Sequence, residues 1–176
     1  MRTKNMEAKG PDEVESFAER LSSRGRADVQ TFHVAGTGPK QLDGRGSWYA
    51  FAEIGTGVEG IRQEDGMTQY IAVYRAFLKV VKYAPPNCRI KVCTDSQLLQ
   101  RHFDRTYGVI DPDLCRLMGK ARQILEDKGI SVKFKLISRS ENRAAAYLER
   151  NEKEEWPPNL RRRKASDPPN GDIESH

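Results

Sequence analysis

The order of strand-like and helix-like segments constrains this sequence more than any other feature. Three β-rich segments, residues 29–35, 47–54 and 60–66, follow one another through loops that contain Gly. Short polar turns between successive strands predict an antiparallel meander. Such a meander must be covered by the segments that follow it, because a sheet with an uncovered apolar face is not stable.

The later segments alternate between helical and strand-like patterns. Apolar residues recur at helical spacing from Tyr70 to Val81, and Ala84-Pro85-Pro86 ends that helix. The remaining elements are a buried strand at 89–94, helices at 96–104 and 112–129, a half-exposed strand at 130–138 and a final helix at 142–155. The predicted order is βββαβααβα, an α/β fold with one mixed five-stranded sheet flanked by helices.

A chain of 176 residues has room for one packed domain and two tails. We place the domain at residues 29–155. Residues 1–28 form a polar tail with a short amphipathic helix predicted over 12–23, which packs on the domain or contacts a partner protein. Residues 156–176 predict a disordered, Pro-rich basic tail. Its cluster at 161–164 resembles a nuclear-import signal, or a flexible arm for nucleic acid or protein partners.

Composition excludes a membrane protein, because no apolar run approaches the roughly 18 residues of a membrane-spanning helix. Three Cys at irregular positions form no disulfide framework, and the first residues lack the apolar stretch of a secretory signal. We therefore expect a soluble, intracellular protein. The 30 Lys and Arg against 25 Asp and Glu give a net charge of +5, which permits a polyanionic partner without requiring one.

Asp95 is the candidate functional residue that the segment order singles out. It directly follows the strand at 89–94, and ligand sites in such sheets lie at the carboxyl ends of the strands. An Asp immediately before a helix is also suited to cap that helix, and the spacing alone favours the cap.

Five segments of the chain resemble type 1 ribonuclease H, in particular its compact members that lack a basic protrusion. They are FHVAGTG at 32–38, GRGSWYAF at 44–51, MTQYIAVYRAFLKVV at 67–81, VCTDSQLLQRHFDRTYGVIDPDL at 92–114 and ISRSENRAAAYLER at 137–150. The resemblance covers roughly residues 29–150. It implies the ribonuclease H-like fold and a relationship to enzymes that cleave RNA in RNA/DNA hybrids.

Ribonuclease H enzymes hold two Mg²⁺ ions with four carboxylates. The resemblance puts those four positions at Ala35, Val73, Asp95 and Ala146, so that one carboxylate remains and three positions are vacant. Mg²⁺ requires several oxygen ligands, so Asp95 alone is predicted to be insufficient as a metal ligand. No cofactor is expected, and Mg²⁺ only if activity is retained. Natural degeneration and deliberate inactivation would both explain the vacancies.

Three other carboxylates are candidates to replace the missing ligands. Asp43 lies in the loop before the second strand, Glu53 lies on that strand, and Glu141 lies just before the last helix. Ordinary surface charge is the simpler interpretation of all three, and Asp43 also begins an Asp-Gly turn.

The resemblance also implies a groove for nucleic acid, recognised through backbone amides and polar side chains. The candidate contacts are Gly36, Thr37, Gly38, Thr68, Gln69, Ser96, Gln97, Asn142 and Arg143. Basic and aromatic residues near the helix at 96–104, among them Arg101 and Tyr107, also suit nucleic-acid contacts, although a solvated helix face explains them equally well.

Three functional hypotheses result. The favoured one is a catalytically impaired or inactive ribonuclease H-like domain that binds RNA/DNA hybrid or RNA, or acts as a protein-interaction module. The alternatives are an active Mg²⁺-dependent ribonuclease H with displaced carboxylates, and a structural scaffold within a larger complex.

Overall fold

The computed structural model describes residues 29–39 and 46–155. The helix expected at 12–23, the candidate ligand Asp43 and the tail at 156–176 lie outside the described residues. No helix in the described ranges is long and apolar enough to cross a membrane.

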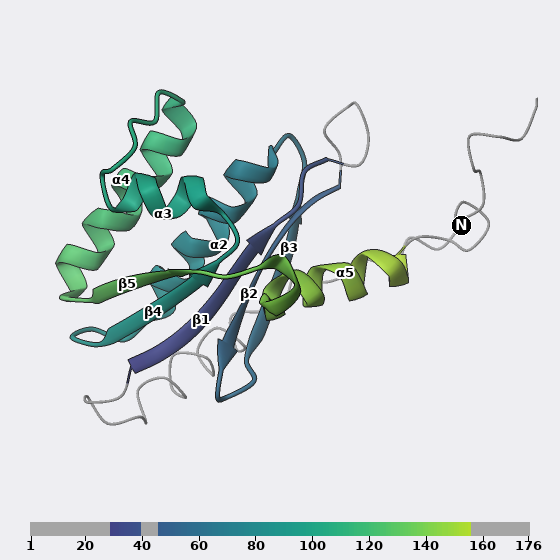
Figure 1. The fold of residues 1–176 in the computed structure, drawn as a ribbon, viewed down its shortest axis with the longest axis horizontal. Helices are drawn as coiled ribbons and strands as arrows, with labels where there is room; N and C mark the ends of the chain where they lie inside the picture. The colour runs from purple at the N-terminus through teal and green to yellow at the C-terminus, as the bar shows by residue number, and fades with distance from the viewer. Residues whose placement is uncertain (1–28, 40–45, 156–176) are drawn as a thin grey trace, which may run out of the picture.

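Five strands form one mixed sheet in the spatial order β3-β2-β1-β4-β5 (Figure 1). β1 (Val29–Gly36), β2 (Ser47–Ile54) and β3 (Glu59–Glu64) pair antiparallel, as the predicted meander requires. β4 (Arg89–Thr94) pairs in parallel with β1, and β5 (Ser131–Leu136) pairs in parallel with β4. The parallel half of the sheet therefore lies on one side of β1 and the meander on the other.

Helices make the crossovers that parallel strands need. α2 (Gln69–Tyr83) connects β3 to β4, and α3 (Gln97–Phe103) and α4 (Pro112–Lys128) connect β4 to β5. These three helices lie on one face of the sheet, whereas α5 (Arg143–Glu155) lies on the opposite face (Figure 1).

Alternation along the strands fills two separate apolar clusters. Phe32 and Val34 of β1 point toward α2 and belong to the larger cluster, which also takes Ile90 and Val92 of β4. Ala35 points to the other face and joins a smaller cluster that consists of alternate residues of β2 and the buried face of α5. The position at the end of β1 is thus buried under α5.

Capping residues define the ends of α2 and α4. The Thr68 hydroxyl accepts a hydrogen bond from the Ile71 N–H at 3.2 Å and caps α2. The Asp111 carboxylate accepts the N–H groups of Asp113 and Leu114 and caps α4. α4 ends at Gly129 with φ +64°, the left-handed conformation expected of a glycine in that position.

The predicted order of elements and the mixed sheet are confirmed, with element bounds that agree to within two residues. The sequence analysis missed one element, a short 3₁₀ helix, η1 (Arg139–Glu141), between β5 and α5. Three residues are too few to leave a helical period in the sequence. This turn proves to shape the candidate site.

Candidate functional site

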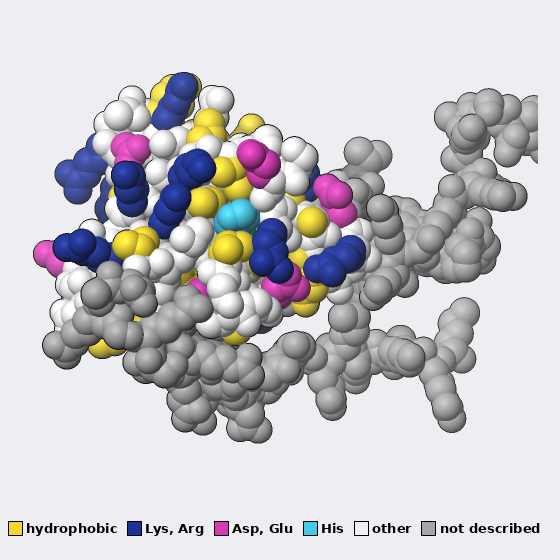
Figure 2. Space-filling model, turned by 60° about the horizontal axis from the view of Figure 1, so that its bottom comes forward, with side chains coloured by type: hydrophobic (Ala, Val, Ile, Leu, Met, Phe, Trp, Pro, Cys, Tyr) yellow, Lys and Arg dark blue, Asp and Glu magenta, His cyan; other side chains and the backbone are white. Residues whose placement is uncertain are grey.

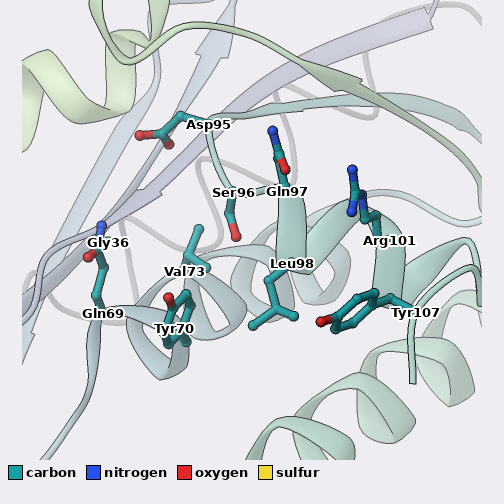
Figure 3. Close-up of a pocket in the computed structure, with 10 residues that line it drawn as sticks. All are labelled: Gly36, Gln69, Tyr70, Val73, Asp95, Ser96, Gln97, Leu98, Arg101 and Tyr107. Atoms are coloured by element: carbon teal, nitrogen blue, oxygen red, sulfur yellow. The ribbon is translucent and has the colours of Figure 1, made fainter. Parts of the chain in front are cut away.

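The carboxyl ends of β1 and β4 meet at one edge of the sheet. Val34 of β1 is in register with Thr94 of β4, so the next residues along the two strands are Ala35 and Asp95. A pocket of about 460 Å³ opens beside Asp95 and is lined from the N-terminal ends of α2 and α3 (Figure 3). Asp95 does not cap α3, because Ser96 is the N-cap and its hydroxyl accepts the Leu99 N–H at 3.2 Å. The helix-cap interpretation of Asp95 is therefore wrong.

The carboxylate of Asp95 is held by two donors of the same chain. Arg139 Nη1 donates to Asp95 Oδ2 at 3.1 Å, and Asn142 Nδ2 donates to Asp95 Oδ1 at 3.1 Å. The Asp95 side chain is 20% exposed, which makes this ion pair partly shielded from solvent. Arg139 Nε also lies 3.5 Å from Glu149 Oε1 on α5. A guanidinium therefore neutralises the carboxylate at the edge of the sheet.

Asn142 ties three elements together. Its side chain is fully buried. Its amide nitrogen donates to the Val34 carbonyl at 3.0 Å as well as to Asp95, while its oxygen accepts the N–H groups of Ala144 and Ala145 at 3.1 and 3.3 Å. Asn142 thus caps α5 and fixes that helix to β1 and to the loop after β4. All its polar atoms are engaged within the chain.

Two of the three positions where the resemblance expects carboxylates lie beside Asp95, namely Ala35 at the matching strand end and Val73 in the same pocket. Ala35 is fully buried at the end of β1, and Val73 on α2 is 4% exposed and lines the pocket (Figure 3). Ala146 is exposed on the first turn of α5, where its N–H donates to the Asn142 carbonyl.

A close backbone approach explains the glycine after Ala35. A Cβ added at Gly36 would lie 2.6 Å from the Val73 nitrogen and 2.7 Å from the Ala72 Cβ. No side chain fits at that separation, so α2 can meet the end of β1 only if residue 36 is glycine. Gly36 therefore sets the position of Val73 relative to the strand.

The polar residues predicted to contact nucleic acid fall into two groups. Gln69, Ser96 and Gln97 line the pocket from the starts of α2 and α3. The others lie around it with engaged or structural roles: Thr37 accepts the Trp48 N–H, Thr68 caps α2, Gly38 lies near Gln69, and the Arg143 N–H donates to His33 Nδ1. The exposed Arg143 side chain makes no ion pair with the residues that the structure describes.

Four pocket residues were not among the predicted contacts of the ribonuclease H pattern. Tyr70 and Tyr107 are 54% and 53% exposed, and Figure 3 shows them on either side of Leu98 along the pocket. Arg101 lines the same pocket from α3. Arg101 and Tyr107 carried a signal in the sequence, namely basic residues mixed with aromatics, whereas Tyr70 was hidden within the apolar pattern of α2.

Arg139 was missed altogether. It follows β5 by three residues, much as Asp95 follows β4 by one, and parallel strands bring such residues to the same edge. A search for every charged residue just after a parallel strand would have found it.

Two of the candidate replacement carboxylates have other partners. Glu53 is fully buried, accepts the Thr56 N–H at 2.7 Å and pairs in the sheet with Phe32, three residues before Ala35. Glu141 accepts the N–H and hydroxyl of Ser138 within the turn of η1, and those hydrogen bonds lower the pKa of the Glu141 carboxyl. Among the described residues, no three His, Cys, Asp or Glu are placed to hold a metal ion together.

The donor set beside the pocket does not fit a pair of Mg²⁺ ions. Such a pair requires several carboxylate oxygens around octahedral ions, whereas Asp95 is accompanied by a methyl group, an isopropyl group and a guanidinium. The Arg139 guanidinium, 3.1 Å from the Asp95 carboxylate, would also repel a divalent ion bound to that carboxylate.

Solved structures of ribonuclease H share this fold. LC11-RNase H1 in complex with an RNA/DNA hybrid matches 68% of this chain and 92% of its own, with 18% identity and a TM-score of 0.59. RNase H1 from the halophilic archaeon Halobacterium salinarum NRC-1 matches 67% of this chain and 93% of its own, with 21% identity and a TM-score of 0.55. An N-terminal RNase H domain from Mycobacterium tuberculosis matches 67% and 95%, with 18% identity and a TM-score of 0.53.

The fold is therefore ribonuclease H-like, and the solved structures that share it include RNase H1 proteins. No protein-family model and no curated protein sequence matches the chain. The predicted fold class is confirmed, and the likeness extends to the fold alone.

Proposed function

We propose that this chain is a ribonuclease H-like domain that binds an RNA/DNA hybrid or RNA at the pocket beside Asp95 and does not cleave it by the two-metal route. The observation that carries the proposal is the ion pair between Asp95 and Arg139. It compensates the charge of Asp95, the one of the four carboxylate positions implied by the resemblance that carries a carboxylate.

Electrostatics favours a phosphate backbone over metal ions at this edge. Four free carboxylates would repel phosphates unless metals neutralised them. Here the charges of Asp95 and Arg139 compensate each other, and Arg101 adds a cation on the opposite side of the pocket. Binding of nucleic acid by this edge therefore needs no divalent ion.

The lining of the pocket suits the single-stranded or minor-groove surface of a nucleic acid. Gln69 and Gln97 are exposed and can exchange hydrogen bonds with 2′-hydroxyl groups and base edges. The half-exposed rings of Tyr70 and Tyr107 offer faces for stacking, which contributes about 1–3 kcal/mol per base in proteins that bind single strands. One solved neighbour of the same fold is an RNase H1 in complex with an RNA/DNA hybrid, which supports the choice of ligand class.

The test is a pair of assays on the same protein. An RNA/DNA hybrid labelled on the RNA strand is titrated with the full chain in EDTA and in Mg²⁺, and the same mixtures are analysed for cleavage. We expect salt-dependent binding of equal strength in both buffers and intact RNA. Cleavage that needs Mg²⁺ or Mn²⁺ and disappears in Asp95→Asn would overturn the proposal in favour of an active enzyme with displaced ligands.

A matched pair of variants locates the binding. Arg101→Gln removes a pocket cation and should weaken hybrid binding, whereas Lys120→Gln, an equal change of charge on exposed α4, should leave it nearly unchanged. Equal losses in both variants would mean that binding is not at the pocket. No binding by the parent chain would instead support the scaffold hypothesis.

A further inference from the structure

A second charged surface lies on the other side of the sheet from α2. Side chains alternate along each strand, and Ile90, Val92, Val132 and Phe134 pack toward α2. The basic residues that alternate with them therefore point to the opposite face. They are Arg89 and Lys91 on β4 and Lys133 and Lys135 on β5. We call these four residues the basic face. Figure 2 shows Lys and Arg side chains spread over this side of the molecule.

The pairing of the strands brings like charges together on the basic face. Lys91 of β4 is in register with Lys133 of β5. Like charges directly opposite in a sheet are destabilising. None of the four basic-face residues forms an ion pair with the part of the chain that the structure describes. Within residues 29–39 and 46–155, the positive charge of the basic face is therefore not compensated by an ion pair.

The basic face lies beside two titratable groups, His33 and Cys93, whose pKa values its lysines lower. Burial lowers the pKa of His33, and Arg143, Lys135 and Lys91 lower it further. Burial raises the pKa of the Cys93 thiol, and Lys91 and Lys135 oppose that rise. His33, Cys93 and Lys135 are neighbours in the register of β1, β4 and β5.

α5 covers only the other half of this face. The cluster beneath α5 is built from Ala35 on β1 and from Trp48, Ala50 and Ala52 on β2, and within the described ranges none of its buried residues belongs to β4 or β5. The basic face on β4 and β5 thus lies beside α5 and is not covered by it.

One segment of the chain has the complementary charge. Residues 12–23, outside the described residues, contain four carboxylates (Asp12, Glu13, Glu15 and Glu19) and one Arg. The same segment carries Val14, Phe17, Ala18 and Leu21 at helical spacing. As a helix it would be about 18 Å long, close to the roughly 20 Å of a six-residue strand.

The connection is short enough to place this segment on the basic face. The described chain begins at Val29, which is in register with Arg89 at the start of that surface and is 53% exposed. Five residues separate position 23 from Val29, and such a connection reaches at most about 20 Å. A tether of this length gives an effective concentration in the millimolar range.

We propose that residues 12–23 dock on the basic face as an acidic amphipathic cover, with their carboxylates against Lys91, Lys133 and Lys135. The apolar stripe of the segment lies on Val29 and on the aliphatic stems of the basic side chains. A nucleic-acid backbone would match the charge but leave that stripe exposed, which favours the segment as the occupant.

Zero-length carbodiimide cross-linking of the full chain tests the proposal, because it joins carboxylates to amines only in direct contact. We expect cross-links from Glu13, Glu15 or Glu19 to the basic face and none to the lysines of the helical side, Lys79, Lys82 and Lys120. A mixture of ¹⁵N-labelled and unlabelled protein separates contacts within one chain from those between copies. Cross-links spread over both sides, or found only between copies, would overturn the proposal.

Lysine acetylation of variants provides the second readout. The triple change Glu13→Gln, Glu15→Gln and Glu19→Gln should raise the acetylation rate of the basic-face lysines severalfold. The control, Asp167→Asn with Asp172→Asn and Glu174→Gln in the C-terminal tail, makes the same change of charge and should not. If the first variant leaves the rates unchanged while an RNA/DNA hybrid protects these lysines, the basic face belongs to nucleic acid and the proposal fails, whether or not the pocket binds the hybrid.

Discussion

The guanidinium of Arg139 lies 3.1 Å from the carboxylate of Asp95, at the edge where β1 and β4 end side by side. Arg139 comes from the turn after β5, and Asp95 follows β4 directly. The contact therefore joins the ends of two neighbouring parallel strands. A divalent ion that approached Asp95 would have to displace a cation bound through a charge-assisted hydrogen bond.

Rebuilding the ligand set should restore metal-dependent cleavage only when Arg139 is also removed. We expect little activity from Ala35→Asp, Val73→Glu and Ala146→Asp together, because the guanidinium still competes for Asp95. Adding Arg139→Gln should produce cleavage of the RNA strand of a labelled hybrid in Mg²⁺. Circular dichroism must show that both variants are folded. Equal activity in the triple and quadruple variants would contradict the competing role of Arg139.

Asn142→Ala should destabilise the fold strongly. The change removes the cap of α5 and leaves the buried Val34 carbonyl without its side-chain donor. A lost cap costs about 1 kcal/mol and an unsatisfied buried group about 1–3 kcal/mol, so we expect a loss of about 2–4 kcal/mol in the free energy of unfolding. Urea denaturation measures it. Asn151→Ala, which removes one half-buried hydrogen bond to the Tyr147 carbonyl, is the control and should cost less than half as much.

Two Gly→Ala changes should have opposite effects on stability. Gly36→Ala places a Cβ 2.6 Å from the Val73 backbone nitrogen, and we expect a loss of about 1–3 kcal/mol as α2 is pushed from β1. Gly119→Ala, within α4, meets no atom within 4 Å and should stabilise by about 0.5–1 kcal/mol. The unfolding temperatures of the two variants and the parent measure these effects. A Gly36→Ala protein as stable as the parent would show that α2 can move away from β1 without a loss of stability.

Stability should fall as the pH drops below the ordinary pKa of histidine. The folded chain lowers the pKa of His33 from 6.5, mainly by burial, and also that of His102. Between the lowered value and 6.5 the unfolded chain binds more protons, so acid favours unfolding. The contribution is complete above pH 6.5 and is lost as the pH passes down through the folded pKa.

Urea denaturation between pH 7.5 and 5 measures this slope. In the parent chain, protonation of His33 removes the acceptor of the Arg143 N–H at Nδ1. His33→Gln removes this titrating group and should therefore make stability depend less on pH. His102→Gln separates the part that comes from the ring beside Tyr74. An unchanged slope in the variant that lacks both rings would refute the assignment.

The sequence predicted the fold well because its signals were local and repeated. Alternation in β1 and β4, the helical period of α2 and the glycine after α4 each determine one element, and the order of elements then leaves few arrangements of a mixed sheet. Residue 95 was correctly placed at a strand end for the same reason.

The partners of Asp95 could not be predicted, because they depend on contacts between distant residues. Arg139 and Asn142 lie 44 and 47 positions from Asp95 and reach it only when β5 takes its place in the sheet. The capping interpretation failed because Ser96, an equally good cap, follows Asp95 directly and takes that role. Local spacing cannot distinguish two adjacent residues that are both suited to one position.

The glycine at position 36 has a wider consequence for this edge of the sheet. Because backbone atoms of α2 meet it directly, the width of the crevice there is set by the main chain and not by the side chains that line it. Walls spaced in this way can carry different side chains, because their separation depends on the main chain. The shape of this edge and the chemistry of its side chains can therefore change independently of each other.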